Sequence, residues 1–471
     1  MAGKNFMNLV ADGKPTSKVL AVQDNLVLTG PLPGAKIFAD VRFAGGAKGV
    51  VWQVDEAGYA ILPLTKEPIK TGEQVVEHSE ELRLGVGHSI LGRVVNPLGK
   101  PLDGGGFVEA TAHVPYFRSA PTFGQRDELN QQLETGVTLV DTLLPVVKGQ
   151  RIAIMGDSKS GKTGFLSQTA IHQAKQGKVV VYVLVAKRRQ EMNRLIARFT
   201  AAGAMKNIVL VVTTSSDPLS LGVLAPYAGC AIGEYFWHAE QDTVVIYDDF
   251  TAHAKLYREM SLMLGNNSGR EAYPGDMFHV QSALLERAGK FKQTGASQTV
   301  LVTGLTPGND LTGYQSTSLI SMTDGQIVFD TTILQTGQQP AVNNSLSVSR
   351  IGGRVQNSTQ QQLSRSIIKE LADYRSAKEY TRFNDQFSEL AETEIALGEH
   401  ITEALNQKAN EWFSLGEQQV LLDVIINHKT PKDLDIDKLK EVIKQNHKTL
   451  AGADEKTLAK VTNLILKQGI K

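Results

Sequence analysis

Cysteine is almost absent from this sequence of 471 residues, in which Cys230 is the single copy. No disulfide can form within the chain, which fits a reducing compartment. The small and apolar residues around Cys230 predict a buried packing residue rather than a reactive thiol. Long apolar runs are also absent: no stretch of about 18 apolar residues occurs, and the N-terminal residues lack the apolar core of a signal peptide. The sequence therefore predicts a chain that does not itself span a membrane.

The chain also has no net charge. Lys and Arg together number 49, as do Asp and Glu, so the formal charge at pH 7 is zero. This balance excludes the broad basic surface of a protein that works on nucleic acid, and a short basic run such as residues 187–189 more often faces phosphate or a neighbouring subunit. The ten histidines lack the paired spacing typical of a metal site. We therefore expect a protein or nucleotide partner rather than nucleic acid.

The chain is too long for one compact core, and its patterning predicts three regions. Short apolar runs between Gly, Pro and Asp turns, from Val19 to about Val76, predict a small β-barrel or sandwich in residues 1–77. Near-continuous apolar strands separated by helical segments predict a parallel sheet covered on both faces in residues 78–356. Residues 357–471 have helical spacing, and Asp454 is the expected N-cap of the last helix. The fold class is thus multidomain α/β with an N-terminal barrel and a C-terminal helical domain.

The chemistry is concentrated in the segment from Gly156 to Thr163, which fits the pattern G-x-x-x-x-G-K-[ST] between a strand and a helix. Its glycines let backbone N–H groups turn toward phosphate oxygens, and the helix N-terminus adds a positive dipole. Lys162 is expected to contact the β- and γ-phosphates, and the Thr163 hydroxyl to bind Mg²⁺. The predicted nucleotide contacts in this segment are Gly156, Asp157, Ser158, Lys159, Ser160, Gly161, Lys162, Thr163 and Gly164. The predicted cofactors are therefore ATP or ADP and Mg²⁺.

Two carboxylates end the apolar strand TVVIYDD, at the sheet edge where ligands of open α/β sheets bind. Asp248 is the expected Mg²⁺ partner, through a water molecule. For Asp249 two interpretations stay open: it contacts the nucleotide site, or it caps the next helix.

The general base of ATP hydrolysis is missing from its expected position. Such a residue usually supplies about 10²- to 10⁴-fold in rate, and in phosphate-loop proteins of this architecture it follows the strand after the loop helix. Here Lys187, Arg188 and Arg189 follow that strand, and none of them accepts a proton while charged. Glu191 comes a turn too late. The sequence therefore predicts a site that holds nucleotide without hydrolysing it well.

Several long segments resemble the α subunit of the F-type ATP synthase, and the resemblance runs almost from end to end. They are GREAYPGDMFHVQSALLERAGKF (residues 269–291), LAPYAGCAIGEYF (residues 224–236), MTDGQI, SLSVSRIGG, and LADYR followed by RFNDQF. The resemblance implies a barrel crown, a central RecA-like domain and a helical C-terminal domain. It also implies a ring in which α-type and catalytic β-type subunits alternate around a γ-type shaft.

The resemblance also implies roles for individual residues. Arg350 would be an arginine finger that reaches the catalytic site of an adjacent β-type subunit, and Ser321 would line the same interface. Nucleotide contacts are implied at Lys187, Pro340 and Gln407. The sequence departs from the family at these places: Lys187 replaces a glutamine, an Arg-Pro pair becomes Gln339-Pro340, and a second adenine-pocket glutamine aligns with Ala409.

The resemblance predicts a rotary ATPase subunit with little activity alone, held at the cytoplasmic face of the bacterial cell membrane only through its complex. A stalk and a membrane sector are candidate further partners, although the family's longer N-terminal segment is not seen before Val19. Two alternatives stay open. One is an α-like subunit of a specialised F-type-like motor that moves no protons, and the other is a hexameric helicase resembling termination factor Rho.

Overall fold

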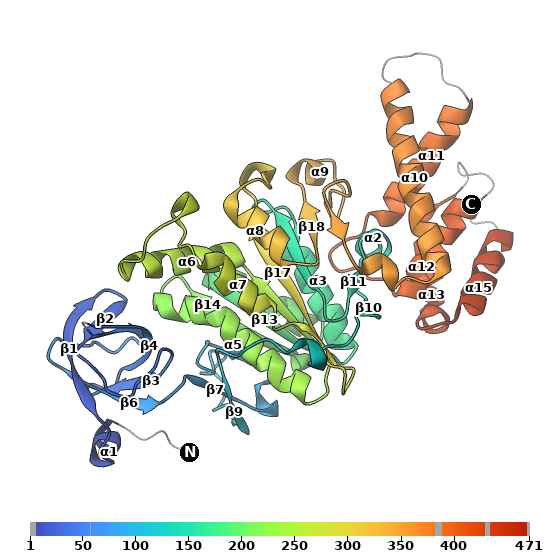
Figure 1. Ribbon diagram of the computed structural model, residues 1–471. Coiled ribbons are helices and arrows are strands. Elements are labelled where there is room, and N and C mark those ends of the chain that lie inside the picture. The colour runs from blue at the N-terminus through green and yellow to red at the C-terminus, as the bar shows by residue number, and fades with distance from the viewer. Residues whose placement is uncertain (1–5, 57, 382–388, 429–433, 469–471) are drawn as a thin grey trace. The chain divides into compact units, whose positions relative to one another are not determined.

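The structure is a computed structural model that describes residues 6–56, 58–381, 389–428 and 434–468 (Figure 1). The chain forms two compact units. Unit 1 comprises residues 1–128, 174–305 and 311–322, and unit 2 comprises residues 129–173, 306–310 and 323–471. Within the described residues, no helix combines the length and apolar character needed to cross a bilayer.

Unit 1 begins with a closed antiparallel barrel, drawn in blue in Figure 1. Its six strands run in the order β1-β2-β5-β4-β3-β6. Their bounds are β1 Thr16–Gln23, β2 Leu26–Thr29, β3 Asp40–Phe43, β4 Lys48–Asp55, β5 Gly58–Pro63 and β6 Gln74–Ser79. The prediction left barrel and sandwich open, and the closed strand order shows that the barrel is right. A short helix, α1 (Phe6–Ala11), packs Phe6 and Leu9 against Val76 of β6.

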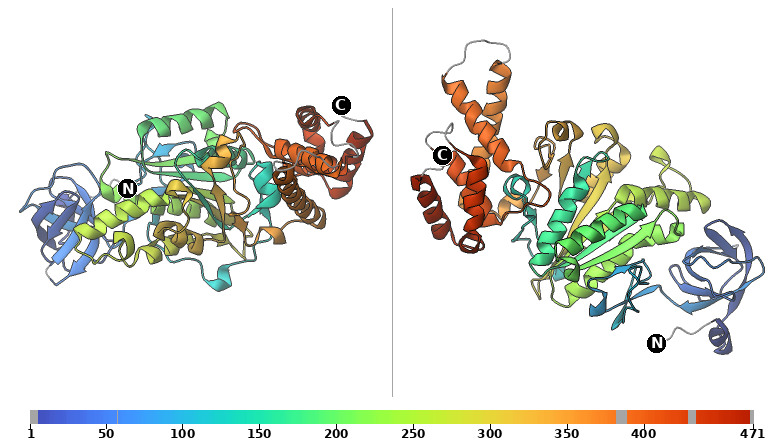
Figure 2. Two further views of the ribbon diagram at one scale, coloured as in Figure 1. Left: turned by 90° about the horizontal axis from the view of Figure 1, so that it is seen from above. Right: turned by 180° about the vertical axis from the view of Figure 1, so that it is seen from behind.

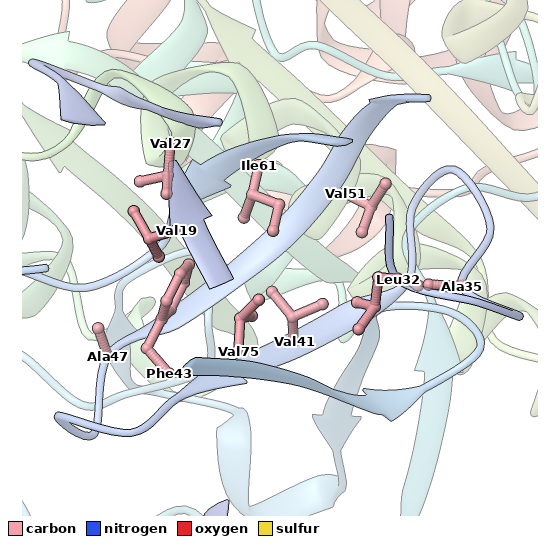
Figure 3. Packing of buried hydrophobic residues seen from close by; sticks show 11 residues of the cluster. Val19, Val27, Leu32, Ala35, Val41, Phe43, Ala47, Val51, Ile61 and Val75 are labelled. Carbon is pink, nitrogen blue, oxygen red and sulfur yellow. The ribbon is translucent and has the colours of Figure 1, made fainter. Parts of the chain in front are cut away.

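The barrel interior is filled by side chains (Figure 3). The apolar residues of each strand point inward because alternate side chains of a strand lie on opposite faces. Fully enclosed members include Val27, Val41, Phe43, Val51 and Ile61, each with no exposed surface. The short apolar runs of the sequence are therefore core strands of one small domain.

The remaining part of unit 1 is built on parallel strands in the order β8-β14-β13-β15-β17. Their bounds are β8 Val94–Val95, β14 Ile208–Thr214, β13 Val179–Lys187, β15 Thr243–Asp248 and β17 Ser297–Leu305. Its helices are α4 Arg189–Ala201, α5 Leu219–His238, α6 Phe250–Met263, α7 Met277–Leu285 and α8 Tyr314–Met322. The predicted apolar strands are confirmed. Four short strands of this part were not predicted: β8, parallel to β14, β16 (Gly289–Lys290), antiparallel to β17, and the antiparallel pair β7 (Arg83–Val86) and β9 (Ala112–Pro115).

Unit 2 contains the strand before the phosphate loop, β12 (Arg151–Gly156), paired in parallel with β18 (Gly325–Phe329). A two-residue strand, β19 (Val348–Ser349), joins β18 in the antiparallel sense, so the sheet is mixed rather than purely parallel. The other elements of this part are α2 Thr138–Leu143, β10 Gln132–Leu133, β11 Val146–Val147, α3 Lys162–Lys175 and α9 Thr331–Gln335.

The C-terminal residues of unit 2 are helical, as predicted. The helices are α10 Ser358–Thr381, α11 Glu389–Leu405, α12 Leu415–Asn427, α13 Ile436–Gln445, α14 His447–Leu450 and α15 Glu455–Gln468. Helices α10 and α11 lie side by side in both figures of the whole chain (Figure 2). They approach closely where Tyr374 packs on Gly398, since a Cβ added at that glycine would collide with the tyrosine.

Local signals define where these helices begin. Asp454, the predicted cap of the last helix, accepts a hydrogen bond from the Thr457 backbone N–H at 2.9 Å. The polar segment at Asn357 starts α10, because Asn357 and Gln360 each accept the other's backbone N–H. The predicted limits near residues 77 and 356 stay predictions; β6 ends at Ser79 and α10 begins at Ser358.

Candidate functional site

The phosphate loop of unit 2 leaves β12 at Gly156 and enters α3 at Lys162. Gly156 has φ +154°, and a Cβ there would lie 2.7 Å from the Phe329 carbonyl oxygen, so only glycine fits. Gly161 has φ +105°, which also favours glycine. Lys159 at the loop tip has φ +60° and an exposed side chain, as does Ser158 beside it, whereas Ser160 is buried. The loop therefore turns back sharply into a helix of 14 residues.

Lys162 is held inside this loop. Its ammonium donates to the carbonyl oxygens of Gly156 at 2.7 Å and Asp157 at 2.6 Å. Asp157 ties the loop to residues 306–310, because its carboxylate accepts the Gly308 N–H at 2.8 Å and also accepts the Ser158 N–H. These two backbone donors hold the pKa of Asp157 below its ordinary value. The predicted phosphate contacts from Gly156 to Gly164 thus share one ordered loop and first helical turn, with Thr163 exposed at the start of α3.

A cavity of about 160 Å³ opens beside the loop. Its walls are Val137, Ser160, Gly161, Gly164, Phe165, Gln168, Phe329, Leu334, Gln339, Pro340, Ala341, Gln407 and Ala409. The mainly apolar wall next to phosphate-binding geometry suits the flat ring of a nucleotide base. The family resemblance had implied Pro340 and Gln407; Phe165, Gln168 and Phe329 were missed, because helix and strand residues outside a motif carry no separate signal for a pocket.

Gln407 lies in this wall with all of its amide groups engaged. Its oxygen accepts the Thr138 N–H at 2.9 Å and the Thr138 hydroxyl at 3.1 Å. Its nitrogen donates to the carbonyl oxygens of Gly136 at 2.7 Å and Glu411 at 2.8 Å. Both lone pairs and both N–H groups of the amide are therefore in use. Gln407 shapes the cavity, and a hydrogen bond from its side chain to a base would have to replace one of these four.

Unit 1 brings together the other predicted contacts at the ends of β13 and β15. The Lys187 ammonium lies 2.7 Å from Asp248 Oδ1 and 3.0 Å from Asp249 Oδ2. Tyr182 donates its hydroxyl to the second oxygen of Asp248 at 3.2 Å. Burial disfavours the charged ammonium, but the two carboxylates outweigh it and raise the pKa of Lys187 above its ordinary value. This position is a stable cation that cannot serve as a proton acceptor.

Asp249 caps the helix that follows it, which is one of the two interpretations that the sequence left open. Its contact with the nucleotide stays a prediction. Its Oδ1 accepts the backbone N–H of Ala252, the contact of an N-cap at the start of α6. The same carboxylate also faces Lys187 through Oδ2. Glu191, the carboxylate considered as a base, is exposed in the first turn of α4.

The site residues suit a nucleotide better than they suit Mg²⁺. A triphosphate fits the Lys162 ammonium, the start of α3 and the adjoining cavity. For Mg²⁺ the exposed Thr163 hydroxyl is a suitable ligand, whereas Asp248 is already neutralised by Lys187. Among the described residues there is no group of three or more His, Cys, Asp and Glu side chains that could hold a metal ion.

The two residues implied for catalysis lie in different units. Arg350 follows β19 in unit 2; it is exposed, and its guanidinium donates to the Thr323 carbonyl oxygen at 3.0 Å. Ser321 is exposed on α8 of unit 1 and donates its hydroxyl to the Thr317 carbonyl oxygen at 2.8 Å.

A buried ion pair joins two of the segments that carried the family resemblance. Glu234, from residues 224–236, and Arg287, from residues 269–291, form two hydrogen bonds of 2.7 Å. Arg287 also donates to the Tyr116 carbonyl oxygen at 2.7 Å. Cys230, one turn before Glu234, is buried as predicted, and burial raises the pKa of its thiol to about 12. The contacts of these residues are those of buried packing residues.

Comparison with known proteins agrees with this geometry. A model of the nucleotide-binding domain of the ATP synthase alpha/beta family matches residues 136–349, and a model of the C-terminal domain of the ATP synthase alpha/beta chain matches residues 356–467. The ATP synthase subunit alpha of Dictyoglomus thermophilum is 36% identical over 428 residues, which cover 90% of this chain and 84% of that protein. That of Neorickettsia sennetsu is 38% identical over 417 residues, covering 86% and 82%.

The chain belongs to the family of ATP synthase α subunits. The resemblance predicted from sequence is confirmed, and so is the three-part fold class. The phosphate loop lies in the first matched region of this α-family chain, and Gln407 and Ala409 of the cavity wall lie in the second. The chain is thus an α-type subunit of a nucleotide-binding rotary ATPase.

Proposed function

We propose that this α-type subunit binds ATP or ADP without hydrolysing it well and donates Arg350 to the catalytic site of an adjacent β-type subunit. The nucleotide would place its phosphates at Lys162 and its base in the cavity walled by Phe329 and Pro340. Mg²⁺ is the expected companion of the phosphates, with the Thr163 hydroxyl as its ligand from the loop.

The observation that carries the non-catalytic role is Lys187. The position where a base would activate water holds an ammonium group 2.7 Å and 3.0 Å from two carboxylates. A charged lysine donates hydrogen bonds and accepts no proton, so this chain lacks a contribution that is usually about 10²- to 10⁴-fold in rate. Turnover would then occur in a site to which another chain contributes the base.

The surface position of Arg350 supports its proposed role. The side chain is exposed while one of its nitrogens is anchored on Thr323, so the guanidinium is oriented without being enclosed. Its planar fork suits the spread negative charge of a phosphoryl group in transfer. Ser321, also exposed, would lie at the same type of subunit boundary.

The proposed assembly is an alternating hexamer with a β-type subunit around a γ-type shaft. A stalk and a membrane sector would complete it, and the complex would hold the chain at the cytoplasmic face of the bacterial membrane. Membership of the α-subunit family favours this rotary assembly over the Rho-like helicase. Mass spectrometry of co-purifying subunits would distinguish a proton-linked synthase from a specialised motor, since only the former should bring ion-conducting membrane subunits.

Steady-state ATP hydrolysis by the complex with its β-type partner tests the arginine assignment. Arg350→Ala should lower kcat by about 10³- to 10⁵-fold, the usual worth of an arginine finger. Arg354→Ala is the matched control, because Arg354 is an exposed arginine four residues later in the same segment. Equal rates for the two variants would refute the role of Arg350. Brisk hydrolysis by the purified chain alone would refute the non-catalytic role.

A further inference from the structure

Polar side chains in the wall of the cavity beside the phosphate loop differ in their ability to select a base. They are Ser160, Gln168, Gln339 and Gln407, and all of them belong to unit 2. The Ser160 hydroxyl accepts from the Lys162 ammonium at 3.5 Å and so forms part of the phosphate loop. The chain itself fills the four bonding positions of the Gln407 amide. Gln339 is exposed, so water competes for its amide, which can turn either end toward a ligand.

Gln168, on α3, is both buried and held in one orientation. The residue is 8% exposed, and its amide nitrogen donates to the Glu411 carbonyl oxygen, which also accepts the Gln407 amide at 2.8 Å. A carbonyl oxygen only accepts, so the Gln168 amide cannot turn over, and its oxygen is the end left for a ligand. Within the described part of the chain, no donor reaches that oxygen. Gln168 thus supplies the cavity wall with a fixed acceptor.

A fixed acceptor selects a ligand that carries an N–H group. On the base of ATP the 6-amino group supplies the only N–H, because N9 carries the ribose and the other ring nitrogens are acceptors. The Gln168 oxygen gains a partner when this amino group binds. It stays unsatisfied, at the cost of a buried polar group without a hydrogen bond, when the base lacks the amine. The rings of Phe165 and Phe329 in the same wall offer apolar contact to any base and do not distinguish one from another.

We propose that Gln168 is a specificity-determining residue of the nucleotide site, and that its side-chain oxygen accepts a hydrogen bond from the 6-amino group of the bound adenine. The inference rests on the proposed function, because it requires that a nucleotide binds with its base in this cavity. It adds to that function the group that recognises the base. Gln407, in the same wall, holds the segment at Glu411 in place and does not contact the base.

Calorimetric titration of the full chain, with Mg²⁺ present throughout, compares ATP with purine riboside 5′-triphosphate, which has a hydrogen in place of the 6-amino group. The wild type should bind ATP about 2- to 13-fold more tightly, the affinity equivalent of one neutral hydrogen bond. In Gln168→Met, which keeps the length of the side chain, the ratio of the two Kd values should fall to about 1, because a change in packing affects both ligands alike and cancels in the ratio.

Gln173→Met is the matched control. Gln173 lies further along the same helix, is 2% exposed, and donates its amide to the Glu134 carbonyl oxygen at 2.6 Å. It therefore has the same kind of amide contact to a backbone carbonyl as Gln168, but it is not one of the residues that line the cavity. The substitution removes an equivalent buried hydrogen bond and should leave the ratio of Kd values as it is in the wild type.

The outcomes separate this inference from the proposed function. Equal Kd values for the two triphosphates in the wild type would overturn the role of Gln168 and leave nucleotide binding intact, and this measurement needs no variant. A wild-type ratio that persists in folded Gln168→Met would also overturn it, because another group would then recognise the amine. So would a ratio that falls equally in Gln173→Met, since the cause would then be a general loosening of the cavity. Absence of binding by both triphosphates would overturn the nucleotide-binding function together with the inference.

Discussion

Replacing Glu234 with glutamine would leave the Arg287 guanidinium enclosed without a counter-charge. The side chains of Arg287 and Glu234 are 2% and 6% exposed, and two hydrogen bonds of 2.7 Å join them. Glutamine keeps the volume and one acceptor, so packing changes little while the charge is lost. Removing one partner of a buried pair usually costs about 3–5 kcal/mol, because the remaining charge has lost both water and partner. We expect a loss of stability in that range.

Urea unfolding, followed by the fluorescence of Trp237, measures this loss of stability close to the substituted residue. Trp237 lies on α5, the helix that carries Glu234, and donates its indole N–H to the Ala296 carbonyl oxygen at 2.9 Å. A background with Trp52→Phe and Trp412→Phe would leave this one reporter, since the chain has three tryptophans.

The pair formed by Arg93 and Asp103 is the matched comparison. It has the same two-bond geometry, at 2.8 Å and 2.9 Å, but its side chains are 19% and 21% exposed. Because water still reaches these groups, Asp103→Asn should cost less than Glu234→Gln. If Glu234→Gln costs no more than Asp103→Asn, burial does not set the strength of the interaction and the reasoning fails.

Three further predictions concern pH, a helix cap and the cavity wall. Burial lowers the pKa of His253 from 6.5 to about 4. The contribution of the neutral imidazole to the free energy of unfolding is therefore complete above pH 6.5 and is lost as pH falls from 6.5 toward 4. The full loss is about 3 kcal/mol. His253→Phe should therefore flatten the fall of the urea midpoint between pH 7 and 5; an equally steep fall would contradict this. Ser414 caps α12 with its hydroxyl. Ser414→Ala should lower the free energy of unfolding in urea by about 1 kcal/mol. An unchanged free energy of unfolding would show that the cap does not contribute to stability. Gln407→Leu should destabilise the chain by about 2 kcal/mol, through the unpaired groups it leaves, without altering the ratio of ATP to GTP affinity in a competition assay; a changed ratio would show that the amide contacts the base.

The regular parts of the fold were predictable because local signals and tertiary structure agree. The strands Arg151–Gly156 and Ile208–Thr214 coincide with apolar runs of the sequence, and each is buried along nearly its whole length. Asp454 was predictable as a cap because its acceptor reaches an N–H only three residues away. The strands β16 and β19 were missed because two residues carry no periodic pattern; their pairing is set by the strands beside them.

The candidate site was predictable as a list of residue types but not as a set of contacts. The motif gave Lys162 and Thr163, since a phosphate loop needs those side chains in fixed sequence positions. It could not reveal that Lys187 pairs with Asp248, which lies 61 positions later in the chain. Nor could it show that the amide of Gln407 is used up by Thr138, separated from it by 269 positions. Such contacts depend on the assembled fold.

The resting place of the Lys162 side chain affects how a ligand enters. Its ammonium lies on two carbonyl oxygens of the turn that precedes it. When an anion binds, it replaces carbonyl oxygens that the Lys162 ammonium already contacts. Because the side chain is already held in place, binding costs little further side-chain rotamer entropy. The same contacts limit the binding free energy, because the hydrogen bonds that Lys162 loses to the two carbonyl oxygens offset part of those that it forms with the anion. Occupancy would thus change the conformation of this turn only slightly.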